Sequence, residues 1–325
     1  MHNYYILFIS LFCLTGCKNK QESYFEEHGK IFHTTYSVKY KYTRSLTAEI
    51  ENELARFDDS LNPFKATSVI AKVNNNEEVV LDTFFINVFN RAQEVSKISD
   101  GLFDITVSPL INAWGFGFKN MDNVTPHMID SLKQLVGYHK IRLQDGKIFK
   151  DNPNIQINTS AIAKGYSSDV IAYLLESYGI CNYMVEIGGE VHAKGLSPKG
   201  LCWNIGITEP VDKNIYDYEH LQTILRLCNK SMATSGNYRN YYVKDNKKYA
   251  HTIDPRTGYP SQSNVLSATV VADDCMTADA YATVFMLTDT AQTRIIAQKE
   301  NLSYFLVLGT SDSTYVTVKS DDFGK

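Results

Sequence analysis

Apolar and polar residues alternate along several short stretches of the chain, which is the pattern of half-buried β-strands. The clearest case is Thr34 to Tyr42, TTYSVKYKY, where apolar residues recur at every second position. Similar stretches predict more strands in the second half, and strands there often follow one another without a helix between them. The strands expected after residue 180 are residues 183–187, 203–208, 241–253, 266–271, 304–308 and 314–319.

Other segments carry apolar residues three and four positions apart, which is the spacing of an amphipathic helix. Asp82 is a good N-cap for a helix that ends near Gly101, and Thr125 precedes a helix that Gly137 closes. Asp145 and Gly146 form a typical hairpin turn within residues 141–150. The remaining helices are expected over residues 47–57, 162–177, 276–287 and 291–300.

This order of elements predicts an α+β fold with mostly antiparallel sheets, because strands follow strands rather than alternating strictly with helices. The sequence contains no low-complexity segment and no internal repeat, and no clear linker follows residue 30. We therefore expect residues 31–325 to form one folded unit of two lobes with helices flanking the sheets. The 21 Tyr and 16 Phe residues favour a strand-rich protein, because aromatic side chains fit pleated surfaces.

The N-terminus has the pattern of an export signal. Residues 6–14, ILFISLFCL, form an apolar run that is too short to cross a bilayer as a mature helix. The next residues end in LTGC and resemble a bacterial lipoprotein signal, in which the thiol of the Cys receives the lipid. We expect residues 1–16 to be a signal peptide, Cys17 to anchor the exported protein in a membrane, and residues 17–30 to form a tether. A buried N-terminal strand is the alternative interpretation.

Charge and cysteine content exclude other classes of protein. The net charge is −4, so the chain lacks the broad basic field with which proteins bind nucleic acid. Four cysteines remain after the expected maturation, and none has the CxxC spacing of a zinc site or a thioredoxin-type motif. Disulfides are permitted in an exported protein, but the sequence assigns none among these four. They are Cys181, Cys202, Cys228 and Cys275.

Two motifs contain groups suited to a cation and to an anion. Asp279 and Thr283 lie four residues apart on an expected helix, so their side chains share one face. A carboxylate and a hydroxyl suit a hard cation such as Mg²⁺, although a solvated pair or a cap explains the same spacing. Lys164 lies in the first turns of another expected helix, where N–H groups and the helix dipole favour an anion. A surface lysine is the alternative.

Two further motifs suit a flat ligand and acid–base chemistry. Residues 100–118, DGLFDITVSPLINAWGFGF, interleave glycines with aromatic residues that either line a heteroaromatic ligand or belong to the core. Asp104 within them needs a partner, because an unpaired buried carboxylate is costly. His251 precedes the turn that starts at Asp254 and has a near-neutral pKa as a free residue, which suits proton transfer. A single histidine beside a turn is more often a surface residue.

Seven blocks of the chain, taken in order, resemble the FAD:protein FMN transferases. These are the ApbE-type flavin transferases, formerly called thiamine-biosynthesis lipoproteins. The similarity covers nearly the whole mature chain, and the lipoprotein signal of the family is matched as well. The blocks are IFHTTY (31–36), DGLFDITVSPLINAWGFG (100–117), INTSAIAKG (157–165), EIGGE (186–190), SGNY (235–238), HTIDPRTG (251–258) and TADAYAT (277–283).

The resemblance implies a T-fold-related enzyme that binds FAD, splits its pyrophosphate with Mg²⁺, and transfers FMN to a Ser or Thr of an exported flavoprotein, releasing AMP. It places His251 near the reacting phosphate as a catalytic residue, together with Asp279. The Mg²⁺ ligands implied by the family are Ala161, Asp279, Ala282 and Thr283. The implied FAD contacts are Phe32, Leu102, Phe103, Asp104, Asn158, Lys164 and Ile253.

Four positions depart from the usual residues of the family. Asn158 stands where many members have Asp, which removes one negative charge near the metal or the flavin. Phe32 and His33 replace the usual Met-Gly, and Ala161 offers only a backbone carbonyl where some relatives offer a hydroxyl. Two other functions remain open on the sequence. One is an Mg²⁺-dependent FAD pyrophosphatase, in which water replaces the acceptor, and the other is a flavin-binding lipoprotein without turnover.

Overall fold

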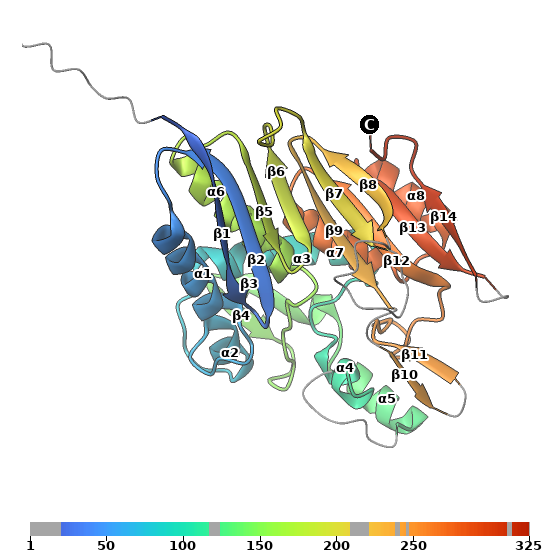
Figure 1. Ribbon diagram of the computed structural model, residues 1–325. Coiled ribbons are helices and arrows are strands. Elements are labelled where there is room, and N and C mark those ends of the chain that lie inside the picture. The colour runs from blue at the N-terminus through green and yellow to red at the C-terminus, as the bar shows by residue number, and fades with distance from the viewer. Residues whose placement is uncertain are drawn as a thin grey trace, which may run out of the picture.

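The computed structural model describes residues 21–116, 124–208, 221–237, 241–244, 247–310 and 314–324. The strands of its large sheet are β1 (Ser23–Ile31), β2 (Thr34–Tyr42), β5 (Tyr183–Ile187), β6 (Glu190–Lys194), β9 (Lys230–Gly236), β12 (Val265–Ala272), β13 (Ser303–Gly309) and β14 (Tyr315–Lys319). They lie side by side in this sequence order, and each neighbouring pair is antiparallel (Figure 1). The predicted α+β fold is confirmed.

Helices cover one face of this sheet (Figure 1). Helix α6 (Ala163–Ser177) packs on β5 and β6, and α7 (Cys275–Phe285) packs on β9 and β12 and against α6. Helix α1 (Thr47–Leu61) contacts α6, and α3 (Thr83–Ile98) contacts α7. The main hydrophobic core lies between these helices and the sheet. Shorter elements are α2 (Val69–Asn74), α8 (Thr290–Lys299) and the hairpin of β3 (Ile141–Gln144) and β4 (Lys147–Lys150).

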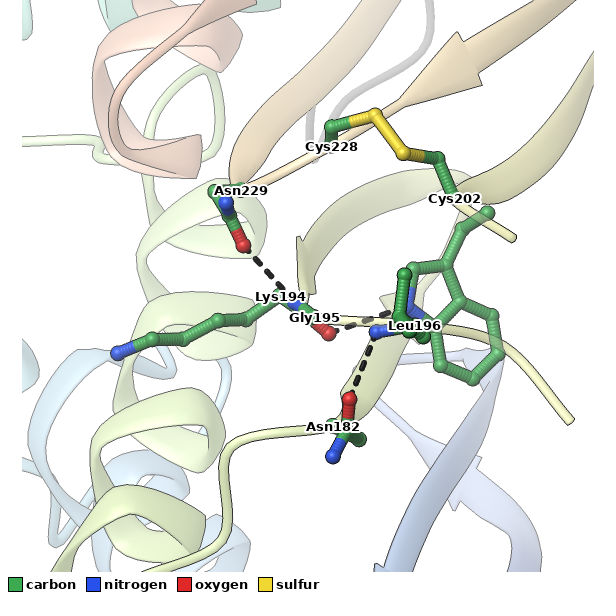
Figure 2. The surroundings of a disulfide bond; sticks show 8 residues. Asn182, Lys194, Gly195, Leu196, Cys202, Cys228 and Asn229 are labelled. Atoms are coloured by element: carbon green, nitrogen blue, oxygen red, sulfur yellow. Dashed lines mark hydrogen bonds between the residues drawn. A yellow bond between two sulfur atoms is a disulfide. The ribbon is translucent and has the colours of Figure 1, made fainter. Parts of the chain in front are cut away.

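The opposite face of the sheet is partly covered by a two-stranded sheet of β7 (Trp203–Thr208) and β8 (Leu221–Leu227). Leu306 of β13 belongs to the main core, whereas its neighbours Phe305 and Val307 pack with Trp203 and Leu225, because side chains alternate between the faces of a strand. A disulfide between Cys202 and Cys228 joins the ends of β7 and β8 (Figure 2).

A smaller group of elements lies at one end of the large sheet (Figure 1). It contains α4 (Ser108–Ala113), α5 (Pro126–Lys133), the 3-10 helix η1 (Tyr138–Lys140) and the hairpin of β10 (Tyr241–Lys244) and β11 (Lys247–Ala250). Its own apolar cluster is small and consists of Leu110, Trp114, Ile129, Val136 and Ile253. Within the described ranges, we find no helix with the length and apolar character needed to cross a membrane.

Local signals predicted many element bounds correctly. Strand β2 spans Thr34–Tyr42 as expected, and Asp82 caps α3 by accepting a hydrogen bond from the Phe85 N–H at 2.9 Å. Asp145 and Gly146 have φ values of +51° and +71°, as a tight hairpin turn requires.

Two expectations about strands and linkers are wrong. Residues 241–253 do not form one strand, because β10 and β11 make a hairpin, and Ile253 forms only an isolated bridge with Pro260. Residues 23–30 do not form a tether, because they belong to β1, which pairs with β2 along its whole length. The charged residues of β1 are those of an edge strand, which is commonly polar. The expected signal peptide, residues 1–16, and Cys17 lie outside the described residues.

Candidate functional site

A cavity of about 930 Å³ lies where the main core, the small cluster and the β7–β8 sheet meet. Its walls come from the loop after α3, the start of α6, the turn between β5 and β6, strand β7, helix α7 and the segment after β11. Segments far apart in the sequence therefore line one space. The predicted site residues that line it are Leu102, Phe103, Asp104, Asn158, Ala161, Lys164, His251, Ile253, Asp279 and Thr283.

Helices α6 and α7 pack against each other and form one wall of the cavity. Asp279 is buried, and its Oδ2 accepts a hydrogen bond from the Gly165 N–H at 2.9 Å. A Cβ atom at Gly165 would lie 2.3 Å from the carbonyl oxygen of Cys275 and 2.7 Å from the Cβ of Asp279. Only glycine permits this approach, because neither neighbour is the movable end of a side chain. The close contact holds the Asp279 carboxylate in one place.

Thr283 lies one turn after Asp279 and also faces the cavity, as the spacing predicted. Its Oγ1 is 3.4 Å from the Oγ of Ser235 on β9, and both of these residues line the same cavity as Asp279. Ala161 lines the cavity just before α6, whereas Ala282 is fully buried in the main core and does not line it. The structure thus brings three of the four implied metal ligands together.

Lys164 and Glu190 form an ion pair at the floor of this site. Burial alone would lower the pKa of Lys164, but the nearby carboxylates of Asp279 and Glu190 raise it above its usual value, so the lysine is charged. Burial raises the pKa of Glu190 and of Asp279, and the Lys164 ammonium opposes both shifts. The Oε2 of Glu190 is buried and has no hydrogen-bond partner among the described residues.

The donor set of this wall fits a hard cation. Asp279 and Thr283 present a carboxylate and a hydroxyl oxygen to the cavity, and Mg²⁺ prefers oxygen ligands of this kind. In the part of the chain that the structure describes, no cluster of three or more His, Cys, Asp or Glu side chains could hold a metal ion. A cation here would therefore depend on hydroxyl, carbonyl or water oxygens beside Asp279.

His251 reaches the cavity from a short arm formed by residues 251–260. Its ring lies against Phe116, with the ring centroids 6.3 Å apart. The Asp254 carbonyl accepts a hydrogen bond from the Gly258 N–H at 2.8 Å, which closes the predicted turn. The Gly258 carbonyl in turn accepts one from the indole N–H of Trp114 at 2.8 Å. The arm is therefore tied to α4 rather than continuing a strand as expected.

Asp104 and Asn158 line the cavity, but their side chains mainly hold loops in place. The oxygens of Asp104 accept hydrogen bonds from the N–H and hydroxyl of Thr106 and from the N–H of Tyr138, at 2.6–2.8 Å. Burial raises the pKa of Asp104, and these hydrogen bonds oppose the shift. The Oδ1 of Asn158 accepts from the N–H and hydroxyl of Ser160 at 2.9 and 2.5 Å.

Phe32 is the other predicted site residue that does not line the cavity. It occupies the turn between β1 and β2 with a φ of +51°, and its ring packs on Phe57 at a centroid distance of 5.5 Å. His33, next in the turn, has a φ of +59° and packs edge-on against Phe64 at 5.9 Å. The bulk that His33 adds in place of the family glycine is thus accommodated at the cavity rim.

Three residues of interest were not singled out as site residues in the sequence analysis. Phe64 lines the cavity and has a side chain that is 66% exposed, which is unusual for phenylalanine and suits stacking on a flat ring. Glu190 lies in the EIGGE block, and Asp169 lies in α6 behind the wall. Phe64 directly follows Asn-Pro in a polar loop, and an aromatic residue in such a place could have been recognised from the sequence as a candidate for ligand contact. The roles of Glu190 and Asp169 could not, because they depend on partners far away in the sequence.

Comparisons with known proteins agree with this geometry. The model of the ApbE family matches residues 32–306. An FAD:protein FMN transferase from Vibrio cholerae is 33% identical over 323 residues, covering 96% of this chain and 95% of that protein. One from Haemophilus influenzae is 35% identical over 329 residues, covering 96% and 94%.

Solved structures show the same fold. The flavin transferase ApbE from Vibrio cholerae superposes with a TM-score of 0.82 at 32% identity, over 93% of this chain and 98% of that chain. The apo flavinyl transferase ApbE from Pseudomonas stutzeri has a TM-score of 0.82 at 27% identity, over 93% and 96%. The family model, the relatives and the structures all cover the segments that build the cavity. The chain belongs to the ApbE family.

Proposed function

We propose that this protein is an FAD:protein FMN transferase, which attaches FMN from FAD to a Ser or Thr hydroxyl of an acceptor protein. The observation that carries the proposal is the convergence of Asp279, Thr283, Lys164 and His251 in one cavity. The curated relatives with this activity in their names cover nearly the whole chain, which supports the same assignment.

The proposed reaction is a phosphoryl-type transfer. The acceptor hydroxyl oxygen bonds to the phosphorus on the FMN side of the pyrophosphate, and the bond from that phosphorus to the oxygen of the AMP phosphate breaks. The hydroxyl proton leaves, and AMP departs with the bridging oxygen. Such a reaction needs positioning and charge stabilisation more than covalent participation by the protein.

The side chains on the α6–α7 wall would manage the charge. Asp279, Thr283 and the carbonyl of Ala161 would hold Mg²⁺, which when bound neutralises charge on the pyrophosphate. Lys164 is charged and partly exposed to the cavity, with 35% of its side chain accessible, so it can bind phosphate oxygens. Glu190 holds the ammonium of Lys164 from behind, which keeps it in the cavity.

The opposite wall would handle the proton and the ring system. His251 lines the cavity on a turn tied to α4, so it can accept the proton of the acceptor hydroxyl. Phe64 and Phe116 line the same space, and their rings offer stacking surfaces to the flat rings of FAD.

We further propose that the protein is exported and anchored through lipid on Cys17. The apolar run of residues 6–14 and the LTGC motif support this localisation. The Cys202–Cys228 disulfide also supports it, because such bonds persist mainly in oxidising compartments outside the cytoplasm. Cells fed labelled palmitate should incorporate label into the parent protein and none into Cys17→Ser. Equal labelling of the two proteins would refute the anchor.

The activity is tested by incubating the full-length protein with FAD, Mg²⁺ and a candidate exported flavoprotein. We expect flavin fluorescence that stays with the denatured acceptor, loss of labelling with a chelator, and its return when Mg²⁺ is added. Free FMN and AMP with an unlabelled acceptor would instead indicate a pyrophosphatase. The absence of AMP with every divalent metal tested would indicate a flavin-binding protein without turnover.

A further inference from the structure

Asp169 lies in α6 behind the cavity wall, and its side chain is almost completely buried. Its Oδ1 accepts a hydrogen bond from the Cys275 N–H and its Oδ2 from the Met276 N–H, both at 2.8 Å. These N–H groups belong to the first turn of α7, where a helix has no backbone partners of its own. A carboxylate of α6 therefore fixes the start of α7.

A carboxylate of α7 likewise accepts a hydrogen bond from a backbone N–H of α6. Asp279 accepts from the N–H of Gly165 at 2.9 Å, one turn before Asp169 on α6. The two helices are thus joined by two carboxylates that point in opposite directions, with Gly165 permitting the close approach. Asp279 and Thr283 both lie on α7, so a displacement of its first turn would move both oxygen groups relative to α6.

His192 completes this arrangement from β6. Its Nδ1 is 2.6 Å from the Oδ1 of Asp169, and its ring lies near the rings of Tyr173 and Tyr183. The Asp169 carboxylate is therefore held on two sides, by the histidine and by the start of α7. Asp169 itself does not line the cavity.

We propose that Asp169 is a positioning residue for the cation site, acting by fixing the start of α7 and hence the oxygens of Asp279 and Thr283. The proposal rests on the proposed function, in which those oxygens hold Mg²⁺. Residues behind metal ligands commonly act in this way, because they restrict the ligands to the geometry that the ion requires.

Asp169→Asn tests the proposal, because it keeps the size of the side chain but replaces one acceptor oxygen with an NH₂ group that cannot accept from α7. Calorimetric titration of the FAD-loaded full-length protein with Mg²⁺ should show affinity that is about 10- to 100-fold weaker. The Mg²⁺ concentration for half-maximal AMP release should rise in parallel, while the KM for FAD stays near that of the parent.

Asp274→Asn is the matched control. Asp274 is the N-cap of the same helix and accepts from the Thr277 N–H at 2.7 Å. Asn and Asp are about equally effective N-caps, so the variant keeps the cap and removes one negative charge from the same helix end. Its Mg²⁺ affinity should equal that of the parent. If both variants weaken Mg²⁺ binding equally, a loss of charge explains the effect and the positioning proposal is overturned.

A second variant serves if Asp169→Asn does not fold. His192→Gln leaves both hydrogen bonds to α7 and removes one restraint on Asp169, so it should weaken Mg²⁺ binding in the same direction by a smaller factor. If Asp169→Asn folds and binds Mg²⁺ with the affinity of the parent, the proposal is overturned. If only His192→Gln folds, the same result with that variant overturns it. If the parent itself binds no Mg²⁺, the cation assignment in the proposed function fails, and the role of Asp169 fails with it.

Discussion

The two walls of the cavity are built in different ways. The α6–α7 wall belongs to the main core, and its buried carboxylates Asp169 and Asp279 each accept hydrogen bonds from the other helix. The His251 arm rests on a small separate cluster of five buried residues and is held by its turn, by the Trp114 indole hydrogen bond and by a hydrogen bond from the Thr252 hydroxyl to the Oδ1 of Asn237 at 2.8 Å. The comparison indicates that the charged groups Asp279 and Lys164 lie on helices of the main core, whereas His251, the proposed proton acceptor, is carried by a smaller element.

The largest effect is expected from Gly165→Ala. The added methyl would overlap the Cys275 carbonyl and the Cβ of Asp279, so α6 and α7 must separate. Overpacking of this kind should lower the free energy of unfolding by about 3 kcal/mol. Transfer should be lost because Asp279 is displaced. Thermal unfolding and AMP release measure the two losses.

Gly179→Ala is the control for this variant, because no atom lies within 4 Å of an added Cβ there. Because φ at this position is +76°, in the left-handed region, alanine should lower the free energy of unfolding by about 1 kcal/mol. Transfer should be unchanged. If Gly165→Ala behaves like Gly179→Ala, the close contact does not matter.

Asp279→Asn should affect activity more than stability. The amide oxygen still accepts from the Gly165 N–H, but the negative charge that would hold Mg²⁺ is gone. We expect transfer below detection, with a melting temperature within a few degrees of the parent. Asp289→Asn, at the N-cap of α8, controls for the loss of one carboxylate elsewhere. Parental transfer by Asp279→Asn would refute the cation assignment.

His251→Ala should separate binding from transfer. Loss of a proton acceptor reduces the rate by about 100- to 10,000-fold, while FAD affinity should change little because the remaining cavity is intact. Stability should also change little, since the ring is only partly buried. His127→Ala, an exposed histidine on α5, is the control. A His251→Ala protein with the parental transfer rate removes His251 from the mechanism.

The smallest effect is expected from Trp114→Phe, which removes the hydrogen bond to the Gly258 carbonyl but keeps an aromatic ring. The loss of that bond costs about 1 kcal/mol, and the looser arm should reduce transfer severalfold. Trp203→Phe removes a comparable hydrogen bond, from the indole N–H to the Lys194 carbonyl at 3.1 Å. It should lower stability by a similar amount without slowing transfer. Equal effects of both variants on transfer would show that the arm has no special role.

Local chemistry explains which parts of the fold the sequence predicts. The cap at Asp82, the Asp145–Gly146 turn and the alternation in Thr34–Tyr42 each depend on residues a few positions apart, and the structure contains all three. Strand β1 escaped prediction because its many charged residues resemble those of a linker. Residues 241–253 contain a hairpin that their strand-like composition does not reveal.

In the site, too, contacts between residues close in the sequence could be predicted, whereas contacts between distant residues could not. The spacing of Asp279 and Thr283 predicts that they share a helix face, and both line the cavity. The partner of Asp279, Gly165, is 114 positions away, and Asp169 is 106 positions from Cys275. No pattern within one segment indicates such contacts. The resemblance to a family supplied His251, since its own neighbourhood indicated only a residue beside a turn.

The most direct test of the central claim compares AMP with covalently bound flavin in one reaction. Full-length protein, FAD, Mg²⁺ and an acceptor flavoprotein are incubated, AMP is quantified, and the acceptor is weighed by intact-mass spectrometry before peptide mapping. We predict equal amounts of AMP and FMN-modified acceptor, with the mass added at a Ser or Thr, and neither product with Asp279→Asn. AMP accompanied by free FMN and an unmodified acceptor would contradict the assignment as a transferase.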